Sequence, residues 1–189
     1  MRSIVLASSS PRRKELLHQI GLEFICHPAS GEECPVSEKP SDIVQELARQ
    51  KALEVAGDYT DAIIIGADTV VSHNGKVLGK PENREHARRM IMSLQGQTHR
   101  VYTGVCLLLV QQKSVVQEIV FADETKVEMY EMSPGEIERY TASGEGDDKA
   151  GAYGIQGACA AFIKGIQGDY YNVVGLPVAR VYQNIKDWL

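Results

Sequence analysis

The sequence predicts an α/β protein, because stretches typical of strands alternate along it with stretches typical of helices. An apolar run at residues 4–7 is followed by three serines and then by a helical pattern over residues 11–20. Residues 61–71 form a continuous run rich in β-branched side chains, as expected of a strand covered on both faces. At 189 residues the chain is long enough to bury a substantial core, as one body or as two lobes about a cleft. We expect a single domain over residues 1–189.

The composition narrows the class of protein. Hydrophobic residues make up 43% of the chain and charged residues 24%, which is typical of a globular domain. The formal net charge of −5 argues against a general nucleic-acid-binding role, which needs a basic face. No apolar run approaches the roughly 20 residues of a membrane span, and the start lacks the pattern of a signal peptide. We therefore expect a cytoplasmic protein. The four cysteines form no C-x-x-C pair, so neither a zinc site nor a disulfide framework is indicated.

The first helix begins with features that suit an anion. Ser10 is a suitable N-cap residue, Pro11 suits the first helical position, and Gly21 suits the end of the last turn. The N–H groups at a helix start attract anions, of which phosphate is the obvious one. Residues 12–14 add three cations at this end, where the helix dipole disfavours positive charge unless an anion is bound. The alternative is a solvated basic turn on an ordinary capped helix.

A second short strand is expected at residues 23–27, followed by a polar loop over residues 28–40. The loop carries two adjacent acids, Glu32 and Glu33. Such a pair is most simply a solvated turn. It becomes a candidate site only where a metal ion needs oxygen ligands nearby.

The next helix, over residues 41–56 with Ser41 as its cap, carries a lysine on its apolar side. Placed at helical spacing, the apolar residues form one broad arc, and Lys51 falls in the middle of it. A lysine there either extends its ammonium past the apolar surface to water or meets an anion in a cleft.

Asp68 lies inside the apolar strand at residues 61–71. A buried carboxylate is costly unless it is paired, hydrogen-bonded or bound to a metal ion. We interpret Asp68 as a catalytic or metal-binding residue, and the alternative is a structural aspartate that caps a turn. The strand continues past it, which favours the first interpretation.

A hairpin follows this strand. Asn74-Gly75 is typical of a tight two-residue turn, and residues 76–78 form the return strand. The register of such a hairpin places Lys80 opposite Thr69, at the end of the strand where Asp68 is found. The sequence therefore predicts an ammonium and a carboxylate at the same end of the hairpin.

The second half of the chain continues the alternation of helices and strands. Ser133 and Glu136 form a capping box, with proline at the first helical position between them. Residues 115–130 are one long strand or two strands broken near Asp123, with apolar residues alternating toward one face. We expect helices at residues 83–94, 134–142 and 177–188, strands at residues 98–110 and 158–163, and turns at residues 111–114 and 165–168.

The loop at residues 144–157 is rich in glycine and charge, and it lacks the pattern of a dinucleotide-binding fingerprint. Its glycines at 151, 154 and 157 suggest backbone held close to another group. Gln156 can offer both a donor and an acceptor to the edge of a planar ligand. The alternative is a flexible loop with an exposed glutamine.

These residues together indicate phosphate chemistry, and at this point a family resemblance appears. Arginines, lysines and carboxylates of this kind bind phosphates and a hard cation and orient water. Six motifs, in order along nearly the whole chain, resemble the Maf family of septum-formation-inhibitor proteins. They are SSSPRR at residues 8–13, GADTVV at 66–71, LGKP at 78–81, THRVYTGV at 98–105, DKAGAYGIQG at 148–157 and NVVGLP at 172–177.

The resemblance implies a fold and an activity. The fold is an elongated mixed sheet flanked by helices, with the site in a cleft between two lobes, as in the inosine triphosphate pyrophosphatases. The activity is that of a nucleoside triphosphate pyrophosphatase, which cuts between the α- and β-phosphates. A divalent cation, Mg²⁺ or Mn²⁺, is the implied cofactor, and a homodimer fits the family. The alternative function is a non-catalytic nucleotide-binding regulator of septum formation.

The resemblance also implies roles for individual residues. Asp68 resembles the family's general base, and Glu33 its acidic metal-site residue, although Glu32 beside it is not excluded. Arg12, Thr69 and Gln156 match the subgroup that acts on dTTP and UTP. The residues that resemble its phosphate contacts are Ser8, Arg12, Arg13, Lys51 and Lys80.

Overall fold

The computed structural model describes residues 2–189, which form two compact units. Unit 1 comprises residues up to Asp68 together with 103–123 and 175–189, and unit 2 comprises residues 69–102 and 124–174. The strands β3 (Asp61–His73), β5 (Thr98–Gln111) and β6 (Ser114–Met129) each contribute residues to both units. The single domain expected from the sequence stays a prediction.

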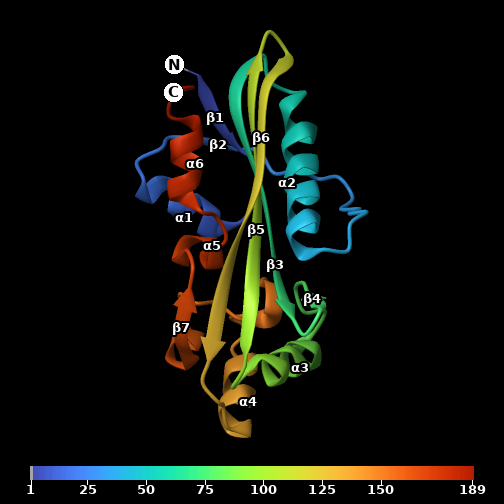
Figure 1. The fold of residues 1–189 in the computed structure, drawn as a ribbon, viewed down its shortest axis with the longest axis vertical. Helices are drawn as coiled ribbons and strands as arrows, with labels where there is room; N and C mark the ends of the chain where they lie inside the picture. Colours follow the sequence, from blue (N-terminus) through green and yellow to red (C-terminus); the bar gives the residue numbers. More distant parts are fainter. Residues whose placement is uncertain (1) are drawn as a thin grey trace. The chain divides into compact units, whose positions relative to one another are not determined.

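Unit 1 contains a parallel part of the sheet and three helices. Strand β1 (Ser3–Leu6) pairs in parallel with β2 (Ile25–Cys26) and with the first residues of β3. Helix α2 (Pro40–Ala56) lies on one side of β3 and β5, and α6 (Val178–Ile185) lies on the other (Figure 1). Helix α1 (Pro11–Gln19) follows β1. The core between α2 and the strands is built mainly from alanine and valine, which lets the helix approach closely.

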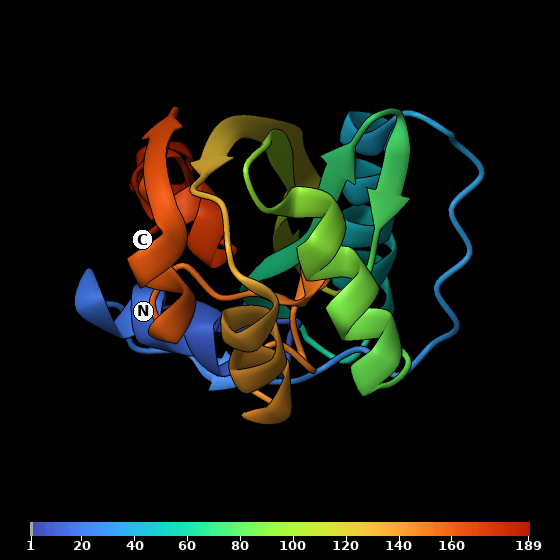
Figure 2. The ribbon, with the colours of Figure 1, turned by 90° about the horizontal axis from the view of Figure 1, so that it is seen from below.

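Unit 2 is organised around a second core. Helices α3 (Arg84–Leu94) and α4 (Pro134–Ala142) pack side by side (Figure 2). Strand β4 (Lys76–Leu78) forms the hairpin with β3, and β7 (Ile163–Gln167) pairs antiparallel with β6. The unit also contains the short 3-10 helices η1 (Ala150–Ala152) and η2 (Ala158–Phe162) and helix α5 (Tyr170–Val174). Its core combines aliphatic side chains with methionines and tyrosines, among them Met90, Tyr140 and Tyr153.

Within residues 2–189 the strands join into one seven-stranded sheet, with the order β2-β1-β3-β5-β6-β7 and with β4 paired to β3. Parallel and antiparallel pairs occur in the same sheet, so the predicted mixed α/β fold is confirmed. The hairpin prediction is also confirmed, because Asn74 and Gly75 both have positive φ and Val71 pairs with Leu78. No helix in the described part of the chain is both long enough and apolar enough to cross a membrane.

Several sequence predictions need correction. Helix α2 begins at Pro40 with Lys39 at the cap position, and the Ser41 hydroxyl donates to the neighbouring Asp42 carboxylate instead of capping the helix. Residues 158–162 form a 3-10 helix, and the strand begins only at Ile163 and runs through the turn expected at 165–168. Helix α5 was not predicted, and α6 is shorter than the expected residues 177–188.

The loop at residues 144–157 is partly buried, although Gln156 is exposed as the alternative interpretation expected. Gly146, Gly151 and residues 152–154 are buried, and a Cβ on Gly146 would lie only 2.0 Å from the Ala152 carbonyl oxygen. Gly151 has a φ of +69° and packs against Val71. The crowding expected at Gly151 is therefore present, but the group that it approaches belongs to the protein core.

Candidate functional site

Three of the predicted site residues meet in unit 1. The Lys51 ammonium on α2 lies 2.6 Å from Asp68 Oδ1 on β3 and 2.8 Å from Glu33 Oε1 in the loop after β2. The side chains of Asp68 and Lys51 are only 13% and 17% exposed, whereas that of Glu33 is 54% exposed. One ammonium thus joins a mostly buried carboxylate to one that is open to solvent. We call Glu33, Lys51 and Asp68 the ion triad.

Lys51 therefore does not extend to open water, and the ion pair explains why a cation lies on the apolar side of α2. The neighbouring Ala48 and Ala52 are fully buried, so the helix surface beside the lysine is small and apolar. A partly buried charge is tolerated when an opposite charge lies in contact, and both carboxylates provide one.

The position of α2 depends on two glycines of the sheet. A Cβ on Gly66 would lie 2.2 Å from the Ala48 carbonyl oxygen, and one on Gly104 would lie 2.2 Å from the Val44 carbonyl oxygen. Both distances are far shorter than any real contact, so the helix backbone lies directly against these two strand positions. This close approach is what allows a lysine on α2 to reach a carboxylate two residues beyond Gly66.

The loop that carries Glu33 is held along α2 by side chains of that helix. Glu54 accepts hydrogen bonds from the backbone N–H groups of Ser30 and Gly31, at 2.7 and 3.1 Å from its Oε1. Gln50 donates to the Glu32 carbonyl oxygen. The bonds from Ser30 and Gly31 favour the ionised form and lower the pKa of Glu54. The loop is exposed, as expected of a solvated turn, but it is hydrogen-bonded to α2. Within it, Glu33 rather than Glu32 supplies the carboxylate that meets Lys51.

Arg13 lies in the first turn of α1, where the resemblance predicts a phosphate contact. Its side chain is buried, and its Nε donates to the Gly175 carbonyl oxygen at 2.9 Å. Its Nη1 donates to the Ala67 carbonyl oxygen at 2.9 Å and to the Ser8 hydroxyl at 3.1 Å. Burial lowers the pKa of Arg13, while the nearby Asp68 carboxylate acts to raise it. Arg13 therefore connects the segments that contain Ser8, Ala67 and Gly175, and Ala67 is the residue immediately before Asp68.

The sequence contained a signal for this position of Arg13. It stands three and four residues before Leu16 and Leu17, and therefore on the same buried face of the helix. Arg12 is off that face and only half-buried. Ser10 occupies the predicted N-cap position, but its side chain makes no capping hydrogen bond.

The remaining predicted site residues, Thr69, Lys80 and Gln156, belong to unit 2. Thr69 is half-buried on β3 next to Asp68 in the chain, whereas Lys80 is exposed two residues after β4 ends. The paired residues of the hairpin stop at Val71 and Leu78, so Lys80 is not paired with Thr69 in the sheet, although the register continues toward that alignment. Gln156 is exposed in a turn that follows the buried residues 151–154.

The segments that carry Lys80 and Gln156 are directly bonded to each other. The Gly151 N–H donates to the Gly79 carbonyl oxygen at 3.0 Å. The loop is further anchored by Tyr153, whose hydroxyl lies 2.7 Å from Nε2 of the buried His99. Burial lowers the pKa of His99 to about 4, so this imidazole is neutral at pH 7. These contacts fix the segment on which Gln156 is carried.

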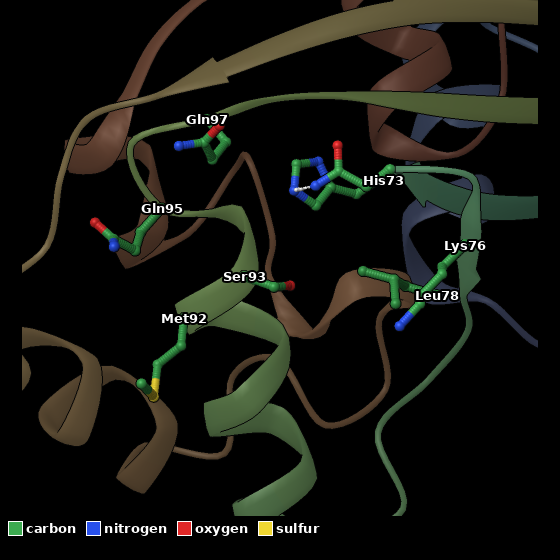
Figure 3. Close-up of a pocket in the computed structure, with 8 residues that line it drawn as sticks. His73, Lys76, Leu78, Met92, Ser93, Gln95 and Gln97 are labelled. Atoms are coloured by element: carbon green, nitrogen blue, oxygen red, sulfur yellow. Dashed lines mark hydrogen bonds between the residues drawn. The ribbon is translucent and has the colours of Figure 1, made fainter.

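A cavity of about 520 Å³ lies elsewhere in unit 2, between the β3–β4 hairpin and the end of α3 (Figure 3). It is lined by His73, Asn74, Lys76, Leu78, Met92, Ser93, Gln95 and Gln97. None of the predicted site residues is among them, and none of these eight residues carries a carboxylate or a thiol. The candidate site is therefore the ion triad and its surroundings rather than this cavity.

The ion triad also provides a test of the predicted metal site. Glu33 and Asp68 direct carboxylate oxygens to a single point, at which the Lys51 ammonium now lies. Within the described residues no group of three or more histidine, cysteine or acidic side chains could hold a metal ion by itself. Two carboxylates completed by substrate phosphates and water are a suitable set of ligands for Mg²⁺. The donor set therefore fits a cation that binds together with a phosphorylated substrate.

A comparison with solved structures concerns the fold. A HAM1 protein from Coxiella burnetii matches over 99% of this chain and 100% of its own, with a TM-score of 0.54 and 15% sequence identity. At this identity the match concerns the fold alone, and it shows that the chain has an α/β fold like that of the HAM1 protein.

The family follows from the sequence comparisons. The model of the Maf family, described as Maf-like protein, matches residues 3–188. A protein named dTTP/UTP pyrophosphatase from Agathobacter rectalis is 51% identical and covers 98% of this chain and 97% of its own length. One of the same name from Bacillus cereus is 47% identical, with 100% and 96% covered. The chain belongs to the Maf family, and the prediction that it is an enzyme, a pyrophosphatase like these relatives, is confirmed.

Proposed function

We propose that this protein hydrolyses dTTP and UTP to the nucleoside monophosphate and pyrophosphate, with Asp68 as the general base. The observation that carries the proposal is the ion triad, in which a mostly buried carboxylate contacts a lysine beside the start of a basic helix. The names of relatives about 50% identical over the whole chain support the choice of substrate.

The proposed chemistry is the attack of water on the α-phosphorus. Asp68 accepts a proton from the water as the new oxygen–phosphorus bond forms. The bond between the α-phosphorus and the oxygen bridging to the β-phosphate then breaks, and pyrophosphate leaves with that oxygen. Lys51 contacts Asp68 through Oδ1, and we assign the acceptance of the proton to the other carboxylate oxygen, Oδ2. Lys51 and Arg12 stabilise the negative charge of the phosphates.

A divalent cation is part of this proposal. Glu33 and Asp68 would hold it together with phosphate oxygens, and Mg²⁺ or Mn²⁺ suits such oxygen ligands. When bound, the cation would neutralise charge on the phosphates and polarise them for attack. The Lys51 ammonium lies where the two carboxylates converge, so it would move toward the phosphates when the cation binds.

Arg13 has a different part in the proposal, since its N–H groups are directed to protein acceptors. We assign it a positioning role. It holds the backbone just before Asp68 against the start of α1 and keeps the Ser8 hydroxyl in place. Lys80 supplies a further contact to the phosphates. Gln156 forms hydrogen bonds to the base, and Thr69 is a further contact to the substrate.

The base preference has a chemical reason. The edge of uracil or thymine presents an acceptor, a donor and an acceptor, and one amide can meet a carbonyl and the ring N–H together. Cytosine lacks that ring N–H, so it would leave the glutamine carbonyl facing another acceptor. An unpaired group of this kind costs roughly 1–3 kcal/mol, enough for about ten- to a hundredfold discrimination.

The experiment is a panel of kcat/KM values with dTTP, UTP, CTP, GTP and ATP in the presence of Mg²⁺, with pyrophosphate as the detected product. We expect dTTP and UTP to be preferred by the parent enzyme and the preference to be lost in Gln156→Ala. A parent that binds dTTP but releases no pyrophosphate would instead support a nucleotide-binding regulator. A parent that prefers GTP would overturn the assignment of the substrate.

A further inference from the structure

The turn that carries Gln156 is held at both ends by two side chains of unit 2. The Gly154 N–H donates to the Tyr140 hydroxyl oxygen at 3.1 Å, on the side before Gln156. The Ala158 N–H donates to Glu145 Oε2 at 2.9 Å, on the side after it. The two flanking backbone groups are therefore fixed by separate side chains.

The two side chains are also bonded to each other. The Tyr140 hydroxyl donates to Glu145 Oε1 at 3.2 Å, so one chain of hydrogen bonds runs from Gly154 through Tyr140 and Glu145 to Ala158. Tyr140 is 5% exposed on α4, and burial raises the pKa of its phenol, which therefore stays protonated and able to donate. We call Tyr140 and Glu145 the loop brace.

The two glycines that flank the Gln156 turn lie close to Glu145 and to Lys149. A Cβ on Gly157 would lie 2.2 Å from Glu145 Oε1, so the carboxylate occupies the space that a side chain would need. A Cβ on Gly154 would lie 2.7 Å from Lys149 Cε, and the ammonium of that lysine donates to the Glu145 carbonyl oxygen. A side chain at position 157 would therefore displace the Glu145 carboxylate, and one at position 154 would displace the end of Lys149.

We propose that Tyr140 and Glu145 are positioning residues that set the base specificity of the enzyme by holding the Gln156 turn in one conformation. The inference rests on the proposed role of Gln156 and deepens it. Neither residue touches the nucleotide. They act because an amide that is to meet two adjacent groups on a base must be held at a fixed position and angle.

The test compares kcat/KM for dTTP and for CTP in the parent and in Tyr140→Phe, which keeps the ring and removes both hydrogen bonds of the hydroxyl. We expect the ratio of dTTP to CTP to fall about tenfold, mainly through a higher KM for dTTP. Glu145→Ala should have the same effect. Glu145→Gln should restore part of the ratio, because it keeps an acceptor for the Ala158 N–H. Tyr130→Phe, at an exposed tyrosine outside the loop brace, is the control and should retain the parent ratio.

A double variant separates positioning from general stability. If Tyr140 acts through Gln156, Gln156→Ala with Tyr140→Phe should show the same ratio as Gln156→Ala alone. Melting temperatures identify variants that fail to fold. If Tyr140→Phe fails to fold, the comparison of Glu145→Ala with Glu145→Gln, at a half-buried residue, decides the test. A parent without preference for dTTP over CTP would overturn the proposed function and this inference together. A parent with the preference, whose ratio survives Tyr140→Phe and Glu145→Ala, would overturn the inference alone.

Discussion

At the scale of single residues, the ion triad determines what each of its members can do. The Lys51 ammonium contacts the carboxylates of both Glu33 and Asp68, and these contacts keep the two carboxylates in a fixed orientation. Removing one partner of a mostly buried ion pair leaves the other with an uncompensated charge. Substitutions that keep the shape of a side chain are therefore more informative than truncations.

The first prediction concerns Asp68. Asp68→Asn should lower kcat by a factor on the order of 10²–10⁴ while nucleotide still binds, because a general base acts in the transition state more than in the ground state. Steady-state kinetics with dTTP and a separate binding titration would measure the two effects. Asp61→Asn is the matched control, since Asp61 begins the same strand and pairs with Arg2 at the surface. Near-normal turnover in Asp68→Asn would remove the residue from its proposed role.

Lys51 should behave differently, because phosphate charge is present in both the ground state and the transition state. Lys51→Met, which keeps much of the apolar stem, should raise KM and also lower kcat. Arg49→Ala is the control from the same helix, where Arg49 is exposed and pairs with Glu118. Kinetic constants of Lys51→Met equal to those of the parent would show that the ammonium serves only to balance the charge of its neighbours.

At the scale of elements, the site depends on how closely α2 packs against the sheet. Gly66 and Gly104 have no side chains that would hold α2 away from the sheet, and Ala48 and Ala52 face Gly66 from the helix. Arg13 performs a similar task on α1, where it bonds to the last backbone carbonyl before Asp68. Close packing of elements thus sets distances between residues that are far apart in the sequence.

The prediction at this scale is that Gly66→Ala lowers both stability and activity. Its Cβ would meet the Ala48 carbonyl oxygen at 2.2 Å and the Ala52 Cβ at 2.9 Å, so α2 must move outward. Overpacking of this kind costs roughly 1–3 kcal/mol of unfolding free energy, which urea denaturation would measure. The kcat/KM for dTTP should fall as well, since Lys51 moves with the helix.

The matched control is Gly165→Ala, because a Cβ at that position of β7 has nothing within 4 Å. It should leave kcat/KM close to the parent value. A Gly66→Ala variant as stable and as active as the control would show that the helix tolerates the displacement, and that close packing is not what holds the ion triad together.

At the scale of the whole molecule, the prediction concerns the metal requirement. Only two protein carboxylates meet in the ion triad, so the cation should bind weakly alone and more strongly with a triphosphate. We expect excess chelator to abolish pyrophosphate release and added Mg²⁺ or Mn²⁺ to restore it. Glu33→Gln should raise the Mg²⁺ concentration needed for half-maximal rate, whereas Glu32→Gln should leave it unchanged. Full activity in excess chelator would contradict the metal requirement.

The sequence by itself determined the elements, because hydrophobic period, caps and turn residues are local signals. The capping box at Ser133 and the turn at Asn74-Gly75 both formed as predicted, and the hairpin register followed from the turn. The same signals failed at residues 158–167. Strand β7 is mostly exposed and is held by backbone pairing with β6, so it has no hydrophobic pattern to indicate its bounds.

The tertiary structure decided which chemical groups meet. Sequence alone left Lys51 between two interpretations and did not decide between Glu32 and Glu33. It treated Arg13 as one of three cations at the start of a helix. Contacts between segments far apart in the chain resolved the positions of these side chains: Lys51 with Asp68 and Glu33, and Arg13 with the carbonyls of Ala67 and Gly175. Such contacts depend on helix and strand packing distances of a few ångströms, which no local pattern specifies. For the same reason the loop brace around Gln156 could be found only in the folded chain.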